Sequence, residues 1–105
     1  MTRGDIVRLT PPKSTGREQQ GPRFGVIIQS DPLAPLSTVI VAPTSQIALQ
    51  THFRPLISFG GEGTKVLVEQ LAAIVVRRAN EKVGQVSVEE MWAIDDAVTL
   101  VVGLH

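Results

Sequence analysis

The chain has 105 residues, with 43% hydrophobic residues, 19% charged residues and ten basic residues that balance ten acidic ones. This composition predicts one small globular domain over residues 1–105, and the lack of cysteine excludes a disulfide framework and a cysteine-based zinc site. No apolar run is long enough to cross a bilayer and the N-terminus lacks a signal peptide, so we expect a cytoplasmic protein with no membrane contact.

The first half of the chain predicts three strands. Residues 4–10 alternate weakly between apolar and polar side chains, which indicates the first strand. Residues 11–22 are rich in proline and glycine and predict a loop whose length makes it a functional candidate. Two β-branched runs, at 24–30 and 37–43, predict the second and third strands, joined by a link that contains two prolines.

The second half predicts three more strands before a helix. Residues 52–58 read as a strand, and Pro55 places it at a sheet edge or a bulge, because proline cannot donate to a ladder. A glycine-rich turn follows it. Residues 65–69 and 71–77 predict two short strands with a kink between them.

A helix is predicted at about residues 87–102. Ser87 and Glu90 have the spacing of a capping box, and Gly103 is a typical helix end. Five apolar residues then recur at helical spacing: Val88, Met91, Ile94, Val98 and Val101. Short strands followed by one helix predict a mostly β (α+β) fold, a small and strongly bent β-barrel capped by the C-terminal helix.

Arg23 and two hydroxyl residues are the main candidates for chemistry. Arg23 opens the second strand, and its guanidinium offers a planar fork of donors that matches a phosphate. Thr44 and Ser45 follow the third strand, where hydroxyls and amides can bind a phosphate oxygen or orient a 2′-hydroxyl. From residue type alone, a solvated arginine and a turn with local hydroxyl–backbone bonds are the commoner explanations.

Other residues have weaker signals. An imidazole can act as a general acid or base, so His52 is a candidate to assist proton transfer, although a histidine in a strand is more often structural. Glu18 is a base or the partner of Arg17. Trp92 lies one position off the helical stripe, which favours core or dimer packing over base stacking. The two histidines lack metal-binding spacing, so we expect no metal and no cofactor.

Charge is uneven along the chain. Residues 1–30 hold five basic and two acidic residues, whereas residues 61–105 hold four basic and seven acidic residues. A local basic region can bind phosphates in a neutral protein, although ordinary surface scatter gives similar counts. The acidic C-terminal part is typical of either a partner surface or a solvated helix face.

In the order and spacing of its motifs, the chain resembles the MazF/PemK family of mRNA-cleaving toxins over roughly residues 3–104. Six segments carry the resemblance: RGDIV, EQQGPRFGVII, VAPTSQ, QTHFRPLI, VEQLAAIVVRR and KVGQVSVEEMWAIDDAVTLVVGL. The family's catalytic arginine and threonine fall on Arg23 and Thr44, and its acidic and glycine loop positions fall on Glu18 and Gly21. Phe24 stands where the family usually has proline.

The resemblance implies an SH3-like barrel of about six to seven strands and a homodimer that binds single-stranded RNA in an interfacial groove. It also implies inhibition by a cognate MazE-like antitoxin with an acidic tail. Cleavage would be metal-independent and specific for a short mRNA sequence, with 2′-hydroxyl attack leaving a 2′,3′-cyclic phosphate and a 5′-hydroxyl.

In this interpretation Arg23 stabilises the charge that builds on phosphorus, and Thr44 positions or polarises the reacting phosphate. His52, Glu18 or Ser45 would assist. The residues expected to bind RNA lie in the loop and at the strand ends: Lys13, Arg17, Gln19, Gly21, Phe24 and Gln46.

Two alternatives belong to other functional classes. A non-enzymatic, CcdB-like gyrase poison on the same fold would act through the end of its C-terminal helix, which the ending VVGLH and the internal Trp92 disfavour. A small-barrel binding module would have no toxicity. Loss of activity on Arg23→Ala in a folded protein separates the nuclease from both.

Overall fold

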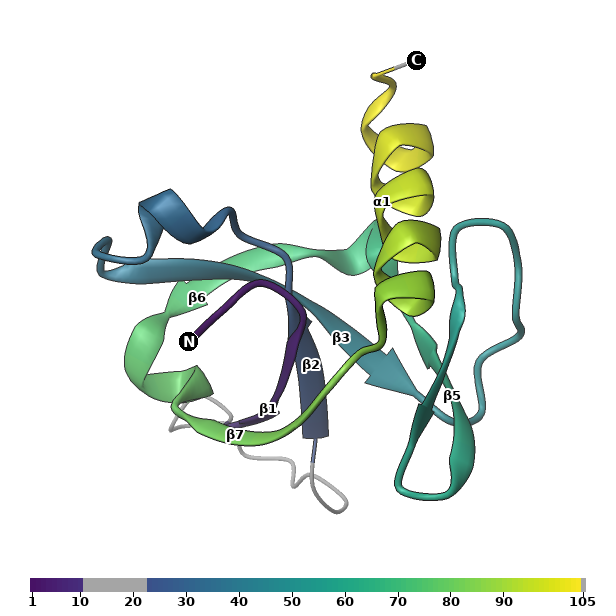
Figure 1. The fold of residues 1–105 in the computed structure, drawn as a ribbon, viewed down its shortest axis with the longest axis horizontal. Helices are drawn as coiled ribbons and strands as arrows, with labels where there is room; N and C mark the ends of the chain where they lie inside the picture. The colour runs from purple at the N-terminus through teal and green to yellow at the C-terminus, as the bar shows by residue number, and fades with distance from the viewer. Residues whose placement is uncertain (11–22, 105) are drawn as a thin grey trace, which may run out of the picture.

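A computed structural model describes residues 1–10 and 23–104 (Figure 1). Seven strands, three short 3-10 helices and one α-helix make up the described chain. Their bounds are β1 Asp5–Leu9, β2 Arg23–Ile27, η1 Asp31–Leu33, β3 Thr38–Ser45, β4 Leu56–Phe59, β5 Glu62–Val66, η2 Val68–Gln70, β6 Ala72–Val75, η3 Val76–Ala79, β7 Glu81–Gln85 and α1 Val88–Val102. The loop predicted at 11–22 lies outside the described residues.

All the strand pairs are antiparallel, and the sheet runs in the order β4-β5-β3-β2-β1-β7, with β6 paired to β3. The eight-residue β3 is central, because its first half pairs with β6 and its last two residues pair with β5. Figure 1 shows the resulting curl, with β6 and the β4–β5 hairpin at opposite ends of β3 and α1 above the hairpin side. The mostly β fold with a C-terminal helix is confirmed.

The central strands β1, β2 and β3 bury side chains on both faces of the sheet. Ile6, Val26 and Ala42 belong to the larger core cluster, whereas Val7, Ile27 and Val41 belong to a second one. Consecutive residues therefore supply opposite faces, as a pleated strand requires. Helix α1 covers the larger cluster through Ile94 and Ala97, which are 0% and 1% exposed.

The predicted helix ends are confirmed, but the predicted apolar stripe is partly wrong. Ser87 and Glu90 form the capping box, and Gly103 ends the helix with a φ of 76°. Val88 at one end of the stripe is 61% exposed, because the face that meets the core is centred on Ile94 and its neighbours. Trp92 is also 61% exposed, so it takes no part in the core of this chain; it sits about 200° around the helix from Ile94.

Three strand predictions need correction. The expected strand 52–58 begins only at Leu56, because Thr51–Arg54 makes a tight bridged turn first; β4 is nevertheless an edge strand, as Pro55 predicted. Residues 62–64 of the glycine-rich turn belong to β5. Residues 68–70 and 76–79 are 3-10 helices rather than strand.

Strand β7 was absent from the sequence prediction. Its residues are mostly polar and exposed, so neither hydrophobicity nor alternation marks them. Pairing with β1 holds it in the sheet. Within the described residues, no helix combines the length and the apolar character that a bilayer span requires.

Candidate functional site

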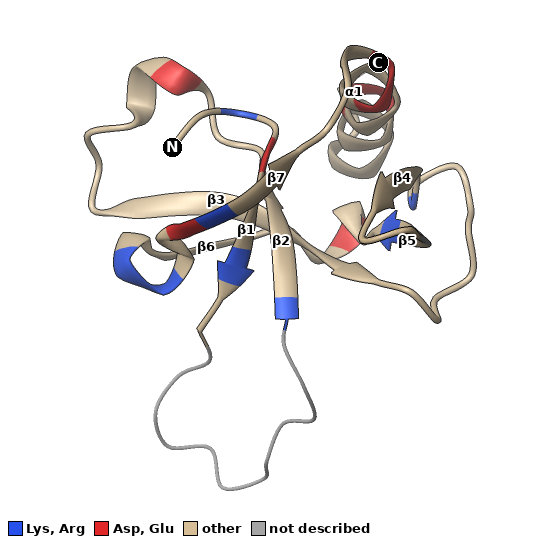
Figure 2. Cartoon of the chain, turned by 60° about the horizontal axis from the view of Figure 1, so that its bottom comes forward, with Lys and Arg blue, Asp and Glu red and all other residues tan. Residues whose placement is uncertain are grey.

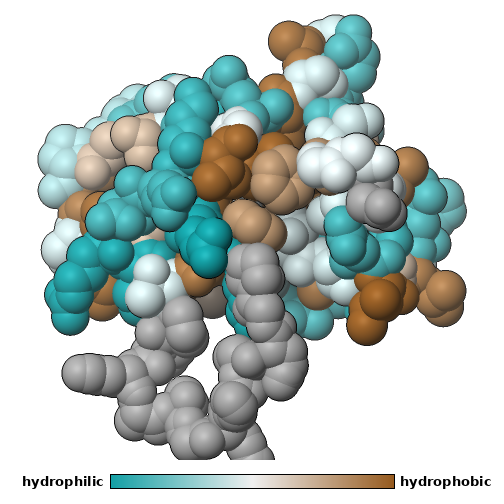
Figure 3. All heavy atoms as spheres, turned by 90° about the horizontal axis from the view of Figure 1, so that it is seen from below, coloured by the Kyte–Doolittle hydropathy of each residue, from teal (hydrophilic) through white to brown (hydrophobic). Residues whose placement is uncertain are grey.

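An open hollow of about 760 Å³ lies where β2 begins and β3 ends, a volume within the usual range for ligand pockets. Its lining combines polar and apolar side chains: Leu9, Arg23, Phe24, Pro43, Thr44, Ser45, Gln46, Ile47, Phe59, Gly60 and Thr64. Seen from below, the molecule shows brown apolar side chains between teal polar ones (Figure 3). The structure thus brings together Arg23, Thr44, Ser45, Phe24 and Gln46, the described candidates from the sequence except His52.

Strand register explains how the main candidates meet. Gly25 pairs with Pro43, and continuing that register places Phe24 opposite Thr44 and Arg23 opposite Ser45. The Thr44 hydroxyl accordingly donates to the Phe24 carbonyl oxygen at 3.3 Å. Arg23 is exposed and lines the same hollow as Thr44 and Ser45.

Glycine at position 25 permits this close approach of the two strands. A Cβ atom there would lie 3.1 Å from the Ala42 carbonyl oxygen and 3.1 Å from the Leu9 side chain. Most real Cβ contacts are longer, so a larger residue would force β2 away from β3. The absence of a side chain at Gly25 therefore helps to set the position of Arg23 relative to Ser45.

A second cation beside the hollow escaped the sequence analysis. Lys65 on β5 pairs with Ser45, and its ammonium group donates to the Gln46 carbonyl oxygen at 2.6 Å. The Ser45 hydroxyl accepts from the Ala48 amide at 3.1 Å, which holds the chain where it leaves β3. The signal was hidden because the glycine-rich sequence before Lys65 reads as a turn rather than as a strand.

Basic residues gather at one end of the molecule. Figure 2 shows blue segments at the end of β1, at the start of β2 and in η3, whereas β7 carries blue and red side by side and α1 carries red. Segment η3 lies beside the end of β1, because Thr10 and Arg78 exchange hydrogen bonds of 2.9 and 2.7 Å. Arg77 and Arg78 belong to the acidic C-terminal part of the sequence, so a count of charge along the chain separates them from the N-terminal basic residues. In the fold they lie beside those residues and extend the same basic surface.

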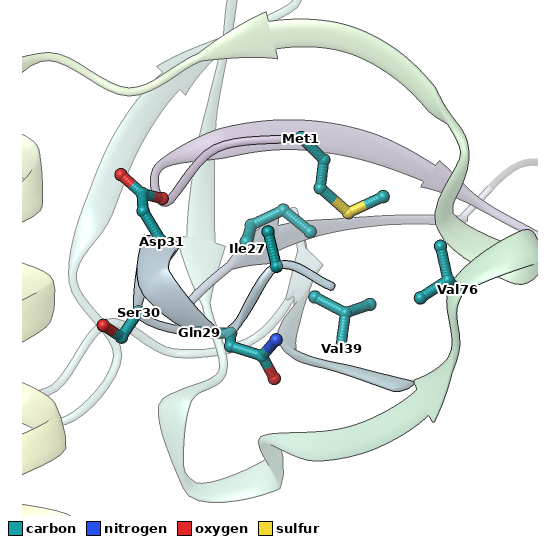
Figure 4. Close-up of a pocket in the computed structure, with 8 residues that line it drawn as sticks. Met1, Ile27, Gln29, Ser30, Asp31, Val39 and Val76 are labelled. Atoms are coloured by element: carbon teal, nitrogen blue, oxygen red, sulfur yellow. The ribbon is translucent and has the colours of Figure 1, made fainter. Parts of the chain in front are cut away.

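His52 does not join the Arg23 hollow in this chain. It is exposed and lines a separate hollow of about 530 Å³, which Leu56 and the helix residues Asp96 and Leu100 also line. A third hollow, of about 130 Å³, is lined mainly by apolar residues such as Met1 and Val39 (Figure 4) and is too small for a nucleotide.

Five further candidates cannot be placed. Lys13, Arg17, Glu18, Gln19 and Gly21 lie outside the described residues. Within residues 1–10 and 23–104, no group of three His, Asp or Glu side chains could hold a metal ion.

Arg54 is a third cation near β4, but it is engaged in an ion pair. Its Nε and Nη2 both donate to Glu69 Oε2, at 3.0 and 2.7 Å. This hydrogen bonding holds the pKa of the Glu69 carboxyl below its ordinary value and raises the pKa of Arg54. The pair joins the turn before β4 to η2, so we assign it to the fold rather than to the hollow.

Comparison with known proteins gives one family and one fold. The family described as PemK-like, MazF-like toxin of type II toxin–antitoxin system matches residues 2–102. A Mycobacterium tuberculosis (strain ATCC 25618 / H37Rv) protein named "Putative toxin Rv3098A/RVBD_3098A" is 34% identical over 90 residues, which are 85% of this chain and 84% of the relative.

Solved structures share the architecture at low sequence identity. A mycobacterial endoribonuclease in complex with its cognate antitoxin superposes with a TM-score of 0.81 at 13% identity, covering 100% of this chain and 97% of that one. The Mycobacterium tuberculosis toxin MazF-mt6 gives 0.78 at 15% identity, with 96% and 98% covered. The MazE–MazF Form-III crystal structure from Deinococcus radiodurans gives 0.78 at 12% identity, with 100% and 98% covered. At these identities the likeness establishes the fold.

Proposed function

Since the chain belongs to the PemK-like, MazF-like toxins of type II toxin–antitoxin systems, we propose that it is an endoribonuclease that cleaves single-stranded mRNA at a short sequence. The observation that carries the proposal is the meeting of Arg23 with the hydroxyls of Thr44 and Ser45 at one hollow large enough for a nucleotide. Solved relatives named as endoribonucleases share this fold, which supports the same assignment.

The chemistry follows from the side chains present. Attack by a 2′-hydroxyl on the adjacent phosphorus builds negative charge on the non-bridging oxygens, and Arg23 offers fixed donors to that charge. As the bond between the 2′-oxygen and phosphorus forms, the bond between phosphorus and the 5′-oxygen breaks. The 2′-hydroxyl proton passes to solvent and the leaving 5′-oxygen takes a proton from solvent, so the products are a 2′,3′-cyclic phosphate and a 5′-hydroxyl. The Thr44 hydroxyl donates its single proton in a hydrogen bond to the Phe24 carbonyl oxygen. Its oxygen can therefore act only as the acceptor of a hydrogen bond from the attacking 2′-hydroxyl.

The hydroxyl of Ser45, which lines the same hollow as Arg23, binds a phosphate oxygen in this scheme. Arginine is a poor base, so Arg23 does not take the proton from the 2′-hydroxyl. We route no proton through His52, because that side chain lines a different hollow. Cleavage in this scheme uses no metal ion.

The basic end of the molecule is also the surface at which we expect an antitoxin to inhibit the activity. We propose that an acidic, MazE-like antitoxin segment competes with RNA for the basic end that holds Arg8, Arg23 and Arg77. A solved relative is itself an endoribonuclease in complex with its cognate antitoxin. We further propose a cytoplasmic homodimer, supported by exposed apolar side chains on α1 such as Trp92 and Leu100.

The test is incubation of the purified protein with a mixed-sequence RNA in EDTA, followed by mapping of the cut ends. Discrete cuts with 5′-hydroxyl ends are expected from the wild type and from Glu89→Ala, an exposed residue of α1 outside both the hollow and the basic end. Arg23→Ala should cut at least about a hundredfold more slowly, by analogy with loss of one transition-state donor. A folded wild type that does not cut would refute the nuclease and favour gyrase inhibition or binding alone.

A further inference from the structure

Two aromatic rings form one wall of the hollow. Phe24 on β2 and Phe59 at the end of β4 meet edge to face, with ring centroids 5.1 Å apart and ring planes at 69°. Both are half-buried, pack against the larger core cluster from behind, and line the hollow in front. Ligand pockets are lined largely by apolar and aromatic side chains, so the face that this ring pair turns to the hollow is a candidate ligand surface.

The position of Phe59 is fixed from several sides. A Cβ atom at Gly84 of β7 would lie 3.6 Å from the Phe59 ring, so the ring passes directly over that glycine. Ser58, the preceding residue, donates its amide to the Glu90 carboxylate of α1 at 2.8 Å. Because core, β7 and α1 already hold this strand end, a ligand that contacts the ring loses little side-chain freedom on binding.

The chemistry around the rings selects a flat ligand with polar edges. Thr44, Thr64 and Gln46 line the same hollow, so hydroxyl and amide groups lie next to the aromatic surface. The hydrogen bond from Thr44 to the Phe24 carbonyl places this wall beside the residue proposed to contact the reacting group. Unstacked bases in single-stranded RNA are recognised by this combination of an aromatic surface and edge donors or acceptors.

We propose that Phe59, together with Phe24, forms the stacking surface for the base of a nucleotide flanking the cleaved phosphodiester, and so sets base preference at that position. The position of this nucleotide next to a cleaved phosphodiester rests on the proposed endoribonuclease function. The stacking surface itself rests on the ring pair. Neither phenylalanine takes part in proton transfer or in binding the phosphate.

The test measures binding and cutting separately. Binding is followed by anisotropy with fluorescein-labelled, short single-stranded RNAs that carry 2′-O-methyl groups, which cannot undergo 2′-hydroxyl attack. The sequences are those of mapped cut sites or, if none is found, a mixed-sequence pool. Phe59→Leu is expected to weaken binding by about tenfold to a hundredfold. Phe53→Leu is the matched control, because Phe53 packs against the same core cluster but lies outside the hollow.

A second measurement changes the RNA and leaves the protein intact. Removal of one base next to the cut site, as an abasic nucleotide, should weaken wild-type binding by the same factor as Phe59→Leu. In the Phe59→Leu protein the same abasic change should have little further effect, and mapped cut sites should lose their preference at that position. An abasic penalty that is equal in the two proteins would overturn the stacking surface.

The remaining outcomes separate this inference from the proposed function. A wild type that binds the 2′-O-methyl RNA and loses binding on Phe59→Leu, yet never cuts unmodified RNA, would support stacking and refute the nuclease. If the wild type cuts RNA, and the Phe59→Leu protein keeps the same cut sites and the same affinity, the nuclease is supported and stacking is refuted. A protein that neither binds nor cuts would refute both.

Discussion

Replacing Glu90 tests whether one carboxylate joins the helix to the edge of the sheet. Its Oε1 accepts from the Ser87 amide at 2.8 Å, and its Oε2 accepts from the Ser58 amide of β4 at 2.8 Å. Hydrogen bonds to charged groups contribute roughly 1.5–3 kcal/mol, but both of these are exposed, so we take about 1 kcal/mol for each. Glu90→Ala should therefore lower the free energy of unfolding by about 2 kcal/mol.

The control is Glu89→Ala, the exposed neighbour in the same first turn of α1. Loss of its charge near the helix N-terminus should change the free energy of unfolding by about 0.5 kcal/mol. Urea denaturation followed by circular dichroism measures both, and amide hydrogen exchange at Ser58 should speed up only in Glu90→Ala. Equal losses of stability in the two variants, with unchanged exchange at Ser58, would refute the link between helix and edge strand.

Three further predictions concern the pH dependence, the strand approach and the exposed tryptophan. Arg54 lowers the pKa of Glu69, so their ion pair stabilises the fold fully above the unfolded-state pKa of Glu69, and this stabilisation is lost as pH falls through the folded-state pKa. Glu69→Gln should therefore make the free energy of unfolding, measured by urea denaturation, fall less steeply with decreasing pH in the acid range. Gly25→Val should lose about 1–3 kcal/mol in urea denaturation through overpacking against Ala42, whereas no loss would show that the strands separate freely. Trp92→Ala should change monomer stability by less than about 1 kcal/mol but weaken self-association in sedimentation velocity; unchanged association would remove Trp92 from the proposed dimer surface.

Local rules predicted the parts of this fold that depend on neighbouring residues. The Ser87–Glu90 capping box and the Gly103 end were readable because each is a pattern within one turn. Strand β7 was not, because its place depends on pairing with β1, almost eighty residues away in the chain. The apolar stripe of α1 failed at Val88 because periodicity identifies a helix face but does not say how far the sheet beneath it extends.

The candidate site also contains residues that the local sequence identifies and residues that only the folded sheet brings to it. Arg23, Phe24, Thr44 and Ser45 were identifiable as strand-end residues, and the register of β2 with β3 joins them. Phe59 and Thr64 reach the hollow, and Lys65 its margin, through the β4–β5 hairpin, and their position depends on the curl of the whole sheet. A glycine-rich hairpin has little sequence signal of its own, so these residues could not be assigned to the site in advance.

The pairing of β1 with β7 has a consequence for how the protein is made. Asp5 pairs with Gln85, and its buried carboxylate lies 3.2 Å from the Lys82 ammonium group. One edge of β1 can pair with β2 early, but its other edge finds β7 only after residue 85 has been synthesised. Phe59 likewise meets Gly84 only at that stage. Contacts between distant parts of a sequence form late and slowly. The sheet that surrounds the hollow can therefore be completed only after the ribosome has translated β7.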